Sequence, residues 1–319
     1  MDTSFLRSEY KQLRFSEYPF GTSASTRYLY LSPQHQTVLE STLRMIGLHQ
    51  GLAVVEGLNG VGKSSIARRV AEILSDSRDA AGEELYPTVY IHTVAYRSSF
   101  SAISDIAERF AQIPPQRSEL AAGRELERWL VAQRAAGRTP VLLLDDAQLL
   151  APASLEAFQS IYNFDVEQKL LQVVFFGQTI ELRELIAGHK GLLHRISIWN
   201  TLNPLSASDA LAMINFRCQV AGRNNPLLED DAYASLYHCS RGIPRTLVNL
   251  CAELLTVLER SGKLVAGLAE AEAAIANYQR RPEEKPTTPA KRPAPQTTAP
   301  AAPAVQTTPS KPRGGKRKH

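Results

Sequence analysis

The chain has 319 residues, 44% of them hydrophobic, and a formal net charge of +4, which suits a globular protein of two modest domains. No run approaches the roughly eighteen apolar residues of a membrane span, and the first residues lack the apolar core of a signal peptide. The three cysteines, Cys218, Cys239 and Cys251, lack metal-ligand spacing, and their odd number fits a reducing compartment. We therefore expect a cytoplasmic protein without a membrane segment.

The charge is distributed unevenly along the chain. From residue 280 onward ten lysines and arginines stand against two glutamates, a net charge of +8, which leaves −4 for the remainder. Proline, alanine and threonine dominate residues 281–319, and a segment of this composition cannot bury a core. We predict a disordered basic tail there, and its charge favours an anionic partner.

The first 34 residues are rich in aromatic side chains, which argues against a disordered leader. Ser32 and Pro33 mark the start of the next helix, because proline suits the first helical turn.

Residues 57–64 have the form G-x-x-x-x-G-K-[ST] of a phosphate-binding P-loop, between an apolar strand pattern at 52–55 and a helical pattern at 65–74. Glycines allow the loop to surround phosphate with N–H groups, Lys63 reaches the β- and γ-phosphates, and the Ser64 hydroxyl ligates Mg²⁺. We predict ATP binding by Gly57, Leu58, Asn59, Gly60, Val61, Gly62, Lys63, Ser64 and Ser65. The aromatic segment 1–34 then has two open roles, packing over the nucleotide base or ordinary packing against the next helix.

A second strong pattern is the apolar run 141–144, which ends in Asp145 and Asp146. A buried central strand would deliver both carboxylates to the carboxyl edge of a sheet. We predict that Asp145 holds the Mg²⁺, directly or through water, and that Asp146 polarises the attacking water.

The remaining patterns complete an α/β fold. Further strands are predicted at 88–94, 171–178 and 196–199, and helices at 101–112, 120–136 and 152–164. Strands alternating with helices predict a parallel five-stranded sheet with helices on both faces, over residues 35–203. Beyond Pro204 the periodicity is purely helical, which predicts a small all-α domain over 204–280, with helices at 206–221, 230–239, 243–260 and 265–278. Adjacent helical residues point apart, so His238 and Cys239 do not make a metal site.

These pieces resemble the AAA+ ATPases, and more narrowly their ExeA-like branch, which contains ExeA/GspA-type secretion ATPases and TniB/TnsC-type transposition regulators. The resemblance covers roughly residues 15 to 280. It rests on the P-loop and on the segments Pro19-Phe20, Tyr28–Ser32, Leu143–Gln148, Leu171–Gln178, Asn203–Ser206 and Ser240–Arg245.

The resemblance implies roles for three more residues and a lid function for the helical domain. Gln178 falls at the sensor-1 position, where it would orient water or contact the γ-phosphate. Arg195 stands just before the fifth strand, where family members often place an arginine finger for a neighbouring subunit. Arg245 falls at the sensor-2 position of the lid. An arginine suits both sites because its planar, permanently charged fork pairs with phosphate oxygens.

One position departs from the family pattern. Asp146 stands where the family usually has Glu, and the shorter side chain places its carboxylate farther from the attacking water. We therefore expect slow hydrolysis.

Three functions are open. The first is an ATP-dependent regulator that assembles as a ring or helical filament on duplex DNA and recruits a partner such as a transposase. The second is an ExeA/GspA-type secretion ATPase, and the third is a nucleotide-dependent scaffold with little hydrolysis. The basic tail favours the first. Arg97 and Lys169, in loops beside the sheet, are candidate DNA contacts.

Overall fold

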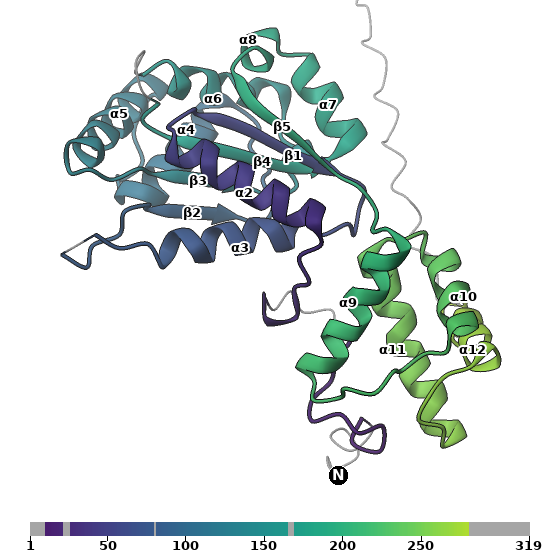
Figure 1. Ribbon diagram of the computed structural model, residues 1–319. Helices are drawn as coiled ribbons and strands as arrows, with labels where there is room; N and C mark the ends of the chain where they lie inside the picture. The colour runs from purple at the N-terminus through teal and green to yellow at the C-terminus, as the bar shows by residue number, and fades with distance from the viewer. Residues whose placement is uncertain (1–9, 22–25, 80, 165–168, 281–319) are drawn as a thin grey trace, which may run out of the picture. The chain divides into compact units, whose positions relative to one another are not determined.

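The computed structural model describes residues 10–21, 26–79, 81–164 and 169–280 (Figure 1). All of these lie in one contact unit, Met1–Arg281. The predicted tail 281–319 and the first nine residues of the aromatic segment lie outside the described residues. Within the described part of the chain, no helix combines the length and the apolar character that crossing a bilayer requires.

The centre of the fold is a five-stranded parallel sheet with the order β2-β3-β4-β1-β5. Its strands are β1 (Leu52–Gly57), β2 (Thr88–Ile91), β3 (Val141–Leu144), β4 (Gln172–Gln178) and β5 (Ile196–Leu202). Because the strands are parallel, their carboxyl ends meet at one edge. The neighbouring strands β3, β4 and β1 therefore bring Asp145 and Asp146, Gln178 and the P-loop to the same place.

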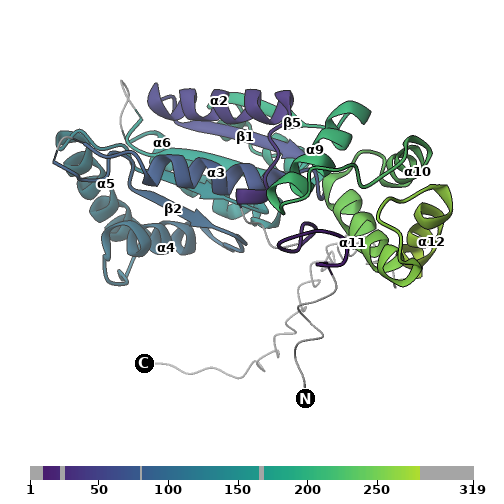
Figure 2. The ribbon, with the colours of Figure 1, turned by 60° about the horizontal axis from the view of Figure 1, so that its bottom comes forward.

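Side chains of the central strands alternate between two buried faces. Ala53 and Val55 of β1 pack into a core with α2 (Pro33–Gly47) and α3 (Lys63–Ser75). Leu52 and Val54 face the opposite core, as the pleat requires. That core is covered by α4 (Ser99–Ala111), α5 (Glu119–Ala135), α6 (Leu155–Tyr162), α7 (Thr179–Ala187) and α8 (Lys190–Leu193), all labelled in Figure 1. Figure 2 shows α4, α5 and α6 from a second side. The α/β fold predicted from the sequence is thus confirmed.

A third core lies in the helical region after β5. It is built by α9 (Ala207–Val220), α10 (Asp230–Ser240), α11 (Pro244–Ser261) and α12 (Leu268–Gln279). Local chemistry fixes the helix starts: the Ser206 hydroxyl accepts the Asp209 N–H at 3.1 Å, and Pro244 stands in the first turn of α11. We call residues 204–280 the lid.

The described part of the N-terminal segment packs mainly into the lid. Leu13, Phe15 and Phe20 are buried in the lid core, with exposed fractions of 1–3%. Of the two roles left open for this segment, packing against the next helix is wrong for residues 10–21. Their aromatic and apolar side chains complete the lid instead.

Several element boundaries differ from the prediction. Strand β2 ends at Ile91 rather than at residue 94, and β5 continues to Leu202, because it pairs with the whole of β1. The helix predicted from residue 152 begins with a 3₁₀ turn, Pro152–Ser154, before α6. Between β4 and β5 the structure adds α7 and α8, which the sequence patterns did not assign.

Candidate nucleotide-binding site

The P-loop joins the end of β1 to the start of α3. Lys63 is the first residue of α3, so the free N–H groups of that helix and its positive dipole end face the loop. Gly60 and Gly62 have φ angles of +83° and +110°, a region that side chains disfavour. At Gly62 an added Cβ would also stand 2.9 Å from His35 Nε2. The glycine spacing thus produces the curved anion-binding loop that the sequence predicts.

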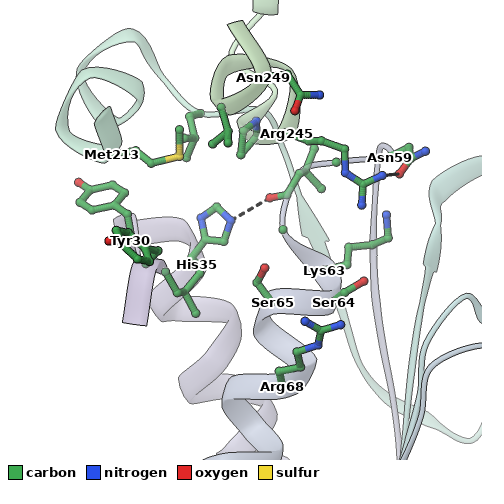
Figure 3. Close-up of a pocket in the computed structure, with 18 of the residues that line it drawn as sticks. Tyr30, His35, Asn59, Lys63, Ser64, Ser65, Arg68, Met213, Arg245 and Asn249 are labelled. Carbon is green, nitrogen blue, oxygen red and sulfur yellow. Dashed lines mark hydrogen bonds between the residues drawn. The ribbon is translucent and has the colours of Figure 1, made fainter. Parts of the chain in front are cut away.

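His35 supports this loop from α2. It is 3% exposed, and its Nε2–H donates to the carbonyl of Val61 at 3.0 Å, so Nδ1 accepts from the Ser32 hydroxyl at 2.7 Å (Figure 3). Burial lowers the pKa of His35, and the bond to Val61 offsets this only in part. His35 is a functional candidate that the sequence patterns missed, because its partner in the loop lies 26 residues away.

Lys63 is 7% exposed, and its Nζ donates to the carbonyls of Gly57 and Leu58, each at 2.9 Å. Burial lowers the pKa of Lys63, while the nearby charges of Asp145 and Asp146 act in the opposite direction. The ammonium group therefore lies inside the loop, with donors directed at oxygen atoms.

The two aspartates after β3 differ in their surroundings. Asp145 is 4% exposed, and its Oδ2 accepts the Tyr90 hydroxyl at 2.9 Å. Burial and the Asp145 carboxylate raise the pKa of Tyr90, so that hydroxyl stays protonated as a donor. Asp146 has a left-handed backbone, with φ 50° and ψ 39°. Asp adopts this conformation more readily than Glu, which gives a physical reason for the shorter residue here.

A cavity of about 930 Å³ joins these groups (Figure 3). Its walls hold the P-loop from Asn59 to Ser65, together with Asp146, Gln178 and Arg245. The structure thus brings together most of the site residues predicted from the sequence. Asp145, Gly57 and Leu58 adjoin the lining residues in the chain without lining the cavity themselves, and Arg195 lies away from it. Arg68 of α3 and Gln148 also line the cavity, although the sequence patterns assigned them no role.

The lid contacts the P-loop directly through Arg245. The backbone N–H of Arg245 donates to Gly60 O at 3.2 Å, and its guanidinium donates to Asn59 Oδ1 at 3.2 Å (Figure 3). An added Cβ at Gly60 would stand 2.9 Å from Arg245 Cβ. The sensor-2 candidate therefore lies beside the loop that would hold phosphate.

The N-terminal segment and the lid form the end of the cavity that lies away from Lys63 (Figure 3). Tyr28, Leu29 and Tyr30 lie there with Met213 and Arg217 of α9. Arg217 is 9% exposed and donates to three carbonyl oxygens. These are Pro19 O at 2.9 Å, Gly21 O at 2.9 Å and Tyr28 O at 3.2 Å. An aromatic and apolar wall of this kind suits a nucleotide base.

Arg195 lies at the opposite edge of the sheet. It precedes β5, whose first residue pairs with the first residue of β1, whereas the P-loop follows the last residue of β1. Its guanidinium donates to Asn163 Oδ1 at 3.3 Å and to Gly191 O, and it lies 5.7 Å from the Tyr162 ring centre. Lys169 lies over the same ring, while Arg97 follows β2 at the other edge. That Arg97 and Lys169 contact DNA stays a prediction.

The sequence predicts Ser64 and Asp145 as Mg²⁺ ligands, and their hydroxyl and carboxylate oxygens are the ligand type that this hard cation prefers. The described residues contain no cluster of three or more His, Cys, Asp or Glu side chains suited to a metal. Mg²⁺ is usually held by one or two side chains together with phosphate oxygens and water, so the two predicted ligands would be enough for it.

This fold, P-loop and lid-lined cavity define an AAA+ protein, and comparison with known proteins agrees. The family described as "AAA domain" matches residues 46–186. The General secretion pathway protein A of Aeromonas hydrophila is 32% identical over 262 residues, covering 79% of this chain and 45% of that protein. The chain belongs to the ExeA-like branch of the AAA+ family. It spans less than half the length of this relative.

Solved structures share the fold at low sequence identity. The Aeropyrum pernix ORC1 protein in complex with DNA is 18% identical with a TM-score of 0.60, over 82% of this chain and 69% of that chain. The Cdc6p protein from Pyrobaculum aerophilum is 19% identical with a TM-score of 0.57, over 77% of this chain and 67% of that chain. These likenesses concern the fold alone.

Proposed function

We propose that this chain is a slowly hydrolysing ATP-dependent regulator that assembles in its ATP form on duplex DNA and recruits a protein partner such as a transposase. One observation carries the nucleotide part of the proposal. The P-loop, Asp146, Gln178 and Arg245 line a single cavity, with an aromatic wall at one end.

Each residue then has a role that its chemistry supports. The P-loop amides and Lys63 bind the phosphates, and Ser64 and Asp145 hold Mg²⁺, which neutralises charge on the phosphate oxygens. In this proposal Asp146 orients the attacking water, and Gln178, which lines the same cavity, contacts the γ-phosphate. Slow turnover is expected because the Asp146 carboxylate is short.

Assembly into a ring or filament is supported by Arg195. It lies at the edge of the sheet opposite the P-loop, so its guanidinium suits the nucleotide of a neighbouring subunit rather than its own. Exposed apolar side chains also follow three adjacent strands beside the cavity. These are Leu58, Leu149 and Ile180, with 51%, 54% and 66% exposure.

The DNA part of the proposal rests on charge. Residues 280–319 carry a net +8, and binding of such a segment to the phosphate backbone releases counterions. The solved relatives with this fold include proteins described as bound to DNA. A cytoplasmic location would suit this role.

A second candidate is an ExeA/GspA-type secretion ATPase, favoured by the 32% identity to the Aeromonas protein. A third, a scaffold with little hydrolysis, is supported only by Asp146. DNA binding separates the first candidate from the other two.

The test begins with ATP binding and hydrolysis. Lys63→Ala should lose most ATP affinity while remaining folded, because it removes the phosphate-binding ammonium. Mixing Lys63→Ala with Arg195→Ala subunits should restore part of the activity, since a mixed interface pairs an intact P-loop with an intact arginine. No recovery despite co-assembly would contradict a shared site.

DNA binding is measured by fluorescence anisotropy of a labelled duplex across a salt series, with a non-hydrolysable ATP analogue. We expect binding that weakens steeply with salt, and more weakly salt-dependent binding after removal of residues 282–319. Full-length protein that binds no duplex at low salt would refute the DNA-associated function and favour the other two candidates.

A further inference from the structure

Gln148 makes two hydrogen bonds that link Asp146 to the end of β4. Its Nε2–H₂ group donates to Asp146 Oδ1 at 3.1 Å, and its Oε1 accepts the backbone N–H of Gln178 at 3.1 Å. A carboxylate can only accept and a backbone N–H can only donate, so one orientation of the amide satisfies both partners. The side chain therefore has a fixed direction between the two.

The structure makes room for this bridge. Gly177, the residue before Gln178 in β4, has no side chain, and an added Cβ there would stand 2.8 Å from Gln148 Oε1. The same Cβ would also stand 2.8 Å from a methyl group of the buried Leu182. A side chain at 177 would therefore displace the Gln148 amide.

Asp146 needs such support because its own backbone does not fix the carboxylate. It follows β3 in a left-handed turn and is only half-buried at the cavity wall. The bond from Gln148 occupies Oδ1 and leaves Oδ2 available for a water molecule. A shift of the β4 end on contact with a γ-phosphate would reach Asp146 through this amide as well as through the direct pairing of β3 with β4.

We propose that Gln148 is a positioning residue for hydrolysis, which holds the Asp146 carboxylate against the end of β4 and couples it to Gln178. This inference rests on the proposed function, since it assumes that Asp146 orients the attacking water. The bridge compensates in part for the shorter aspartate.

The test compares four variants of the full chain. Gln148→Met keeps the side-chain length and removes both bonds, and Gln148→Glu keeps the acceptor for Gln178 but removes the donor to Asp146. Gln34→Glu is the matched control. Gln34 is also a half-buried bridging amide, donating to Thr201 O at 2.9 Å and accepting from Asn203 N at 3.4 Å, but it lies outside the cavity walls. Asp146→Asn tests the proposed function itself.

ATP affinity is measured by titration with labelled nucleotide, and hydrolysis by single-turnover kinetics across pH. Both Gln148 variants should lower the hydrolysis rate about tenfold with ATP affinity within about twofold, because only the water-orienting group is disturbed. Gln34→Glu should change neither quantity.

The variants distinguish a failure of the Gln148 positioning role from a failure of the proposed function. If Asp146→Asn lowers the rate but Gln148→Met stays within about twofold of wild type, the positioning role is wrong while the proposed site stands. If Gln34→Glu lowers the rate as much as Gln148→Glu, the effect is general and the positioning role is also overturned. If Asp146→Asn hydrolyses ATP like wild type, the proposed function fails, and the inference with it.

Discussion

Two buried arginines in the lid allow a sharp test of how the nucleotide cavity is built. Arg217 and Arg223 are 9% and 4% exposed, and each donates to several backbone carbonyls. Arg217 holds the N-terminal segment through Pro19 O, Gly21 O and Tyr28 O. Arg223 also reaches that segment, with a bond of 2.9 Å to Leu13 O. Only Arg217 lines the cavity.

Replacing either arginine with methionine removes at least three bonds from a charged donor. Such bonds contribute about 1.5–3 kcal/mol each, but the variant no longer buries a charge, so we expect a net loss of about 2–4 kcal/mol for each. Arg217→Met also frees Tyr28, whose ring lies 5.1 Å from the guanidinium carbon. We therefore expect ATP affinity to fall about tenfold, or about 1.4 kcal/mol, in Arg217→Met and to stay near wild type in Arg223→Met.

The assay combines urea unfolding with titration of labelled ATP at a temperature where both variants are folded. Equal losses of stability in the two variants, with lower ATP affinity in Arg217→Met alone, would support a role of Arg217 in the nucleotide-binding wall of the cavity. Equal losses of ATP affinity in the two variants would refute the assignment, because the effect would then follow from the lid as a whole. An unchanged affinity in Arg217→Met would refute it as well.

Two further predictions concern Mg²⁺ and pH. Tyr90→Phe removes the hydroxyl that donates to Asp145, so about tenfold more Mg²⁺ should be needed for full ATP affinity. The control Tyr96→Phe removes the hydroxyl paired with Asp105 and should leave the Mg²⁺ requirement unchanged. Equal Mg²⁺ titrations in both variants would contradict the role of Tyr90. His35 has a lowered pKa, so its contribution to stability is complete above about pH 6.5 and is lost as the pH falls through its folded-state pKa. His35→Asn should flatten the decline of melting temperature between about pH 7 and 5, whereas the exposed His194→Asn should leave it intact; a decline that persists in His35→Asn would place its origin elsewhere.

The sequence predicted the parts of the site that depend on local pattern. The P-loop is a contiguous motif, and the run before Asp145 and Asp146 is apolar enough to identify a buried strand. Parallel strands then place both at one edge, which is why the predicted site residues meet in the structure.

The residues that the sequence missed make contacts across large separations. Tyr90 meets Asp145 because β2 and β3 pair with Tyr90 opposite Leu143, and Arg217 meets Pro19 across 198 residues. Neither register nor long-range packing can be read from a local pattern. Gln148 could have been predicted as a site residue, because it lies in the same motif as Asp146. Its role, however, depends on the absence of a side chain at Gly177.

Arg245 makes two contacts with the P-loop that can be separated by mutation. Its backbone N–H donates to Gly60 O, so the start of α11 would follow the P-loop whatever the side chain is. Its guanidinium bonds Asn59 Oδ1 and is exposed, so phosphate oxygens can compete for it with little desolvation cost. Through the backbone contact, the position of the lid would depend on the conformation of the loop. The guanidinium, in contrast, would respond to the negative charge of a bound nucleotide. Arg217 ties the same lid to Tyr28, so the lid contacts the P-loop through Arg245 and the N-terminal segment through Arg217.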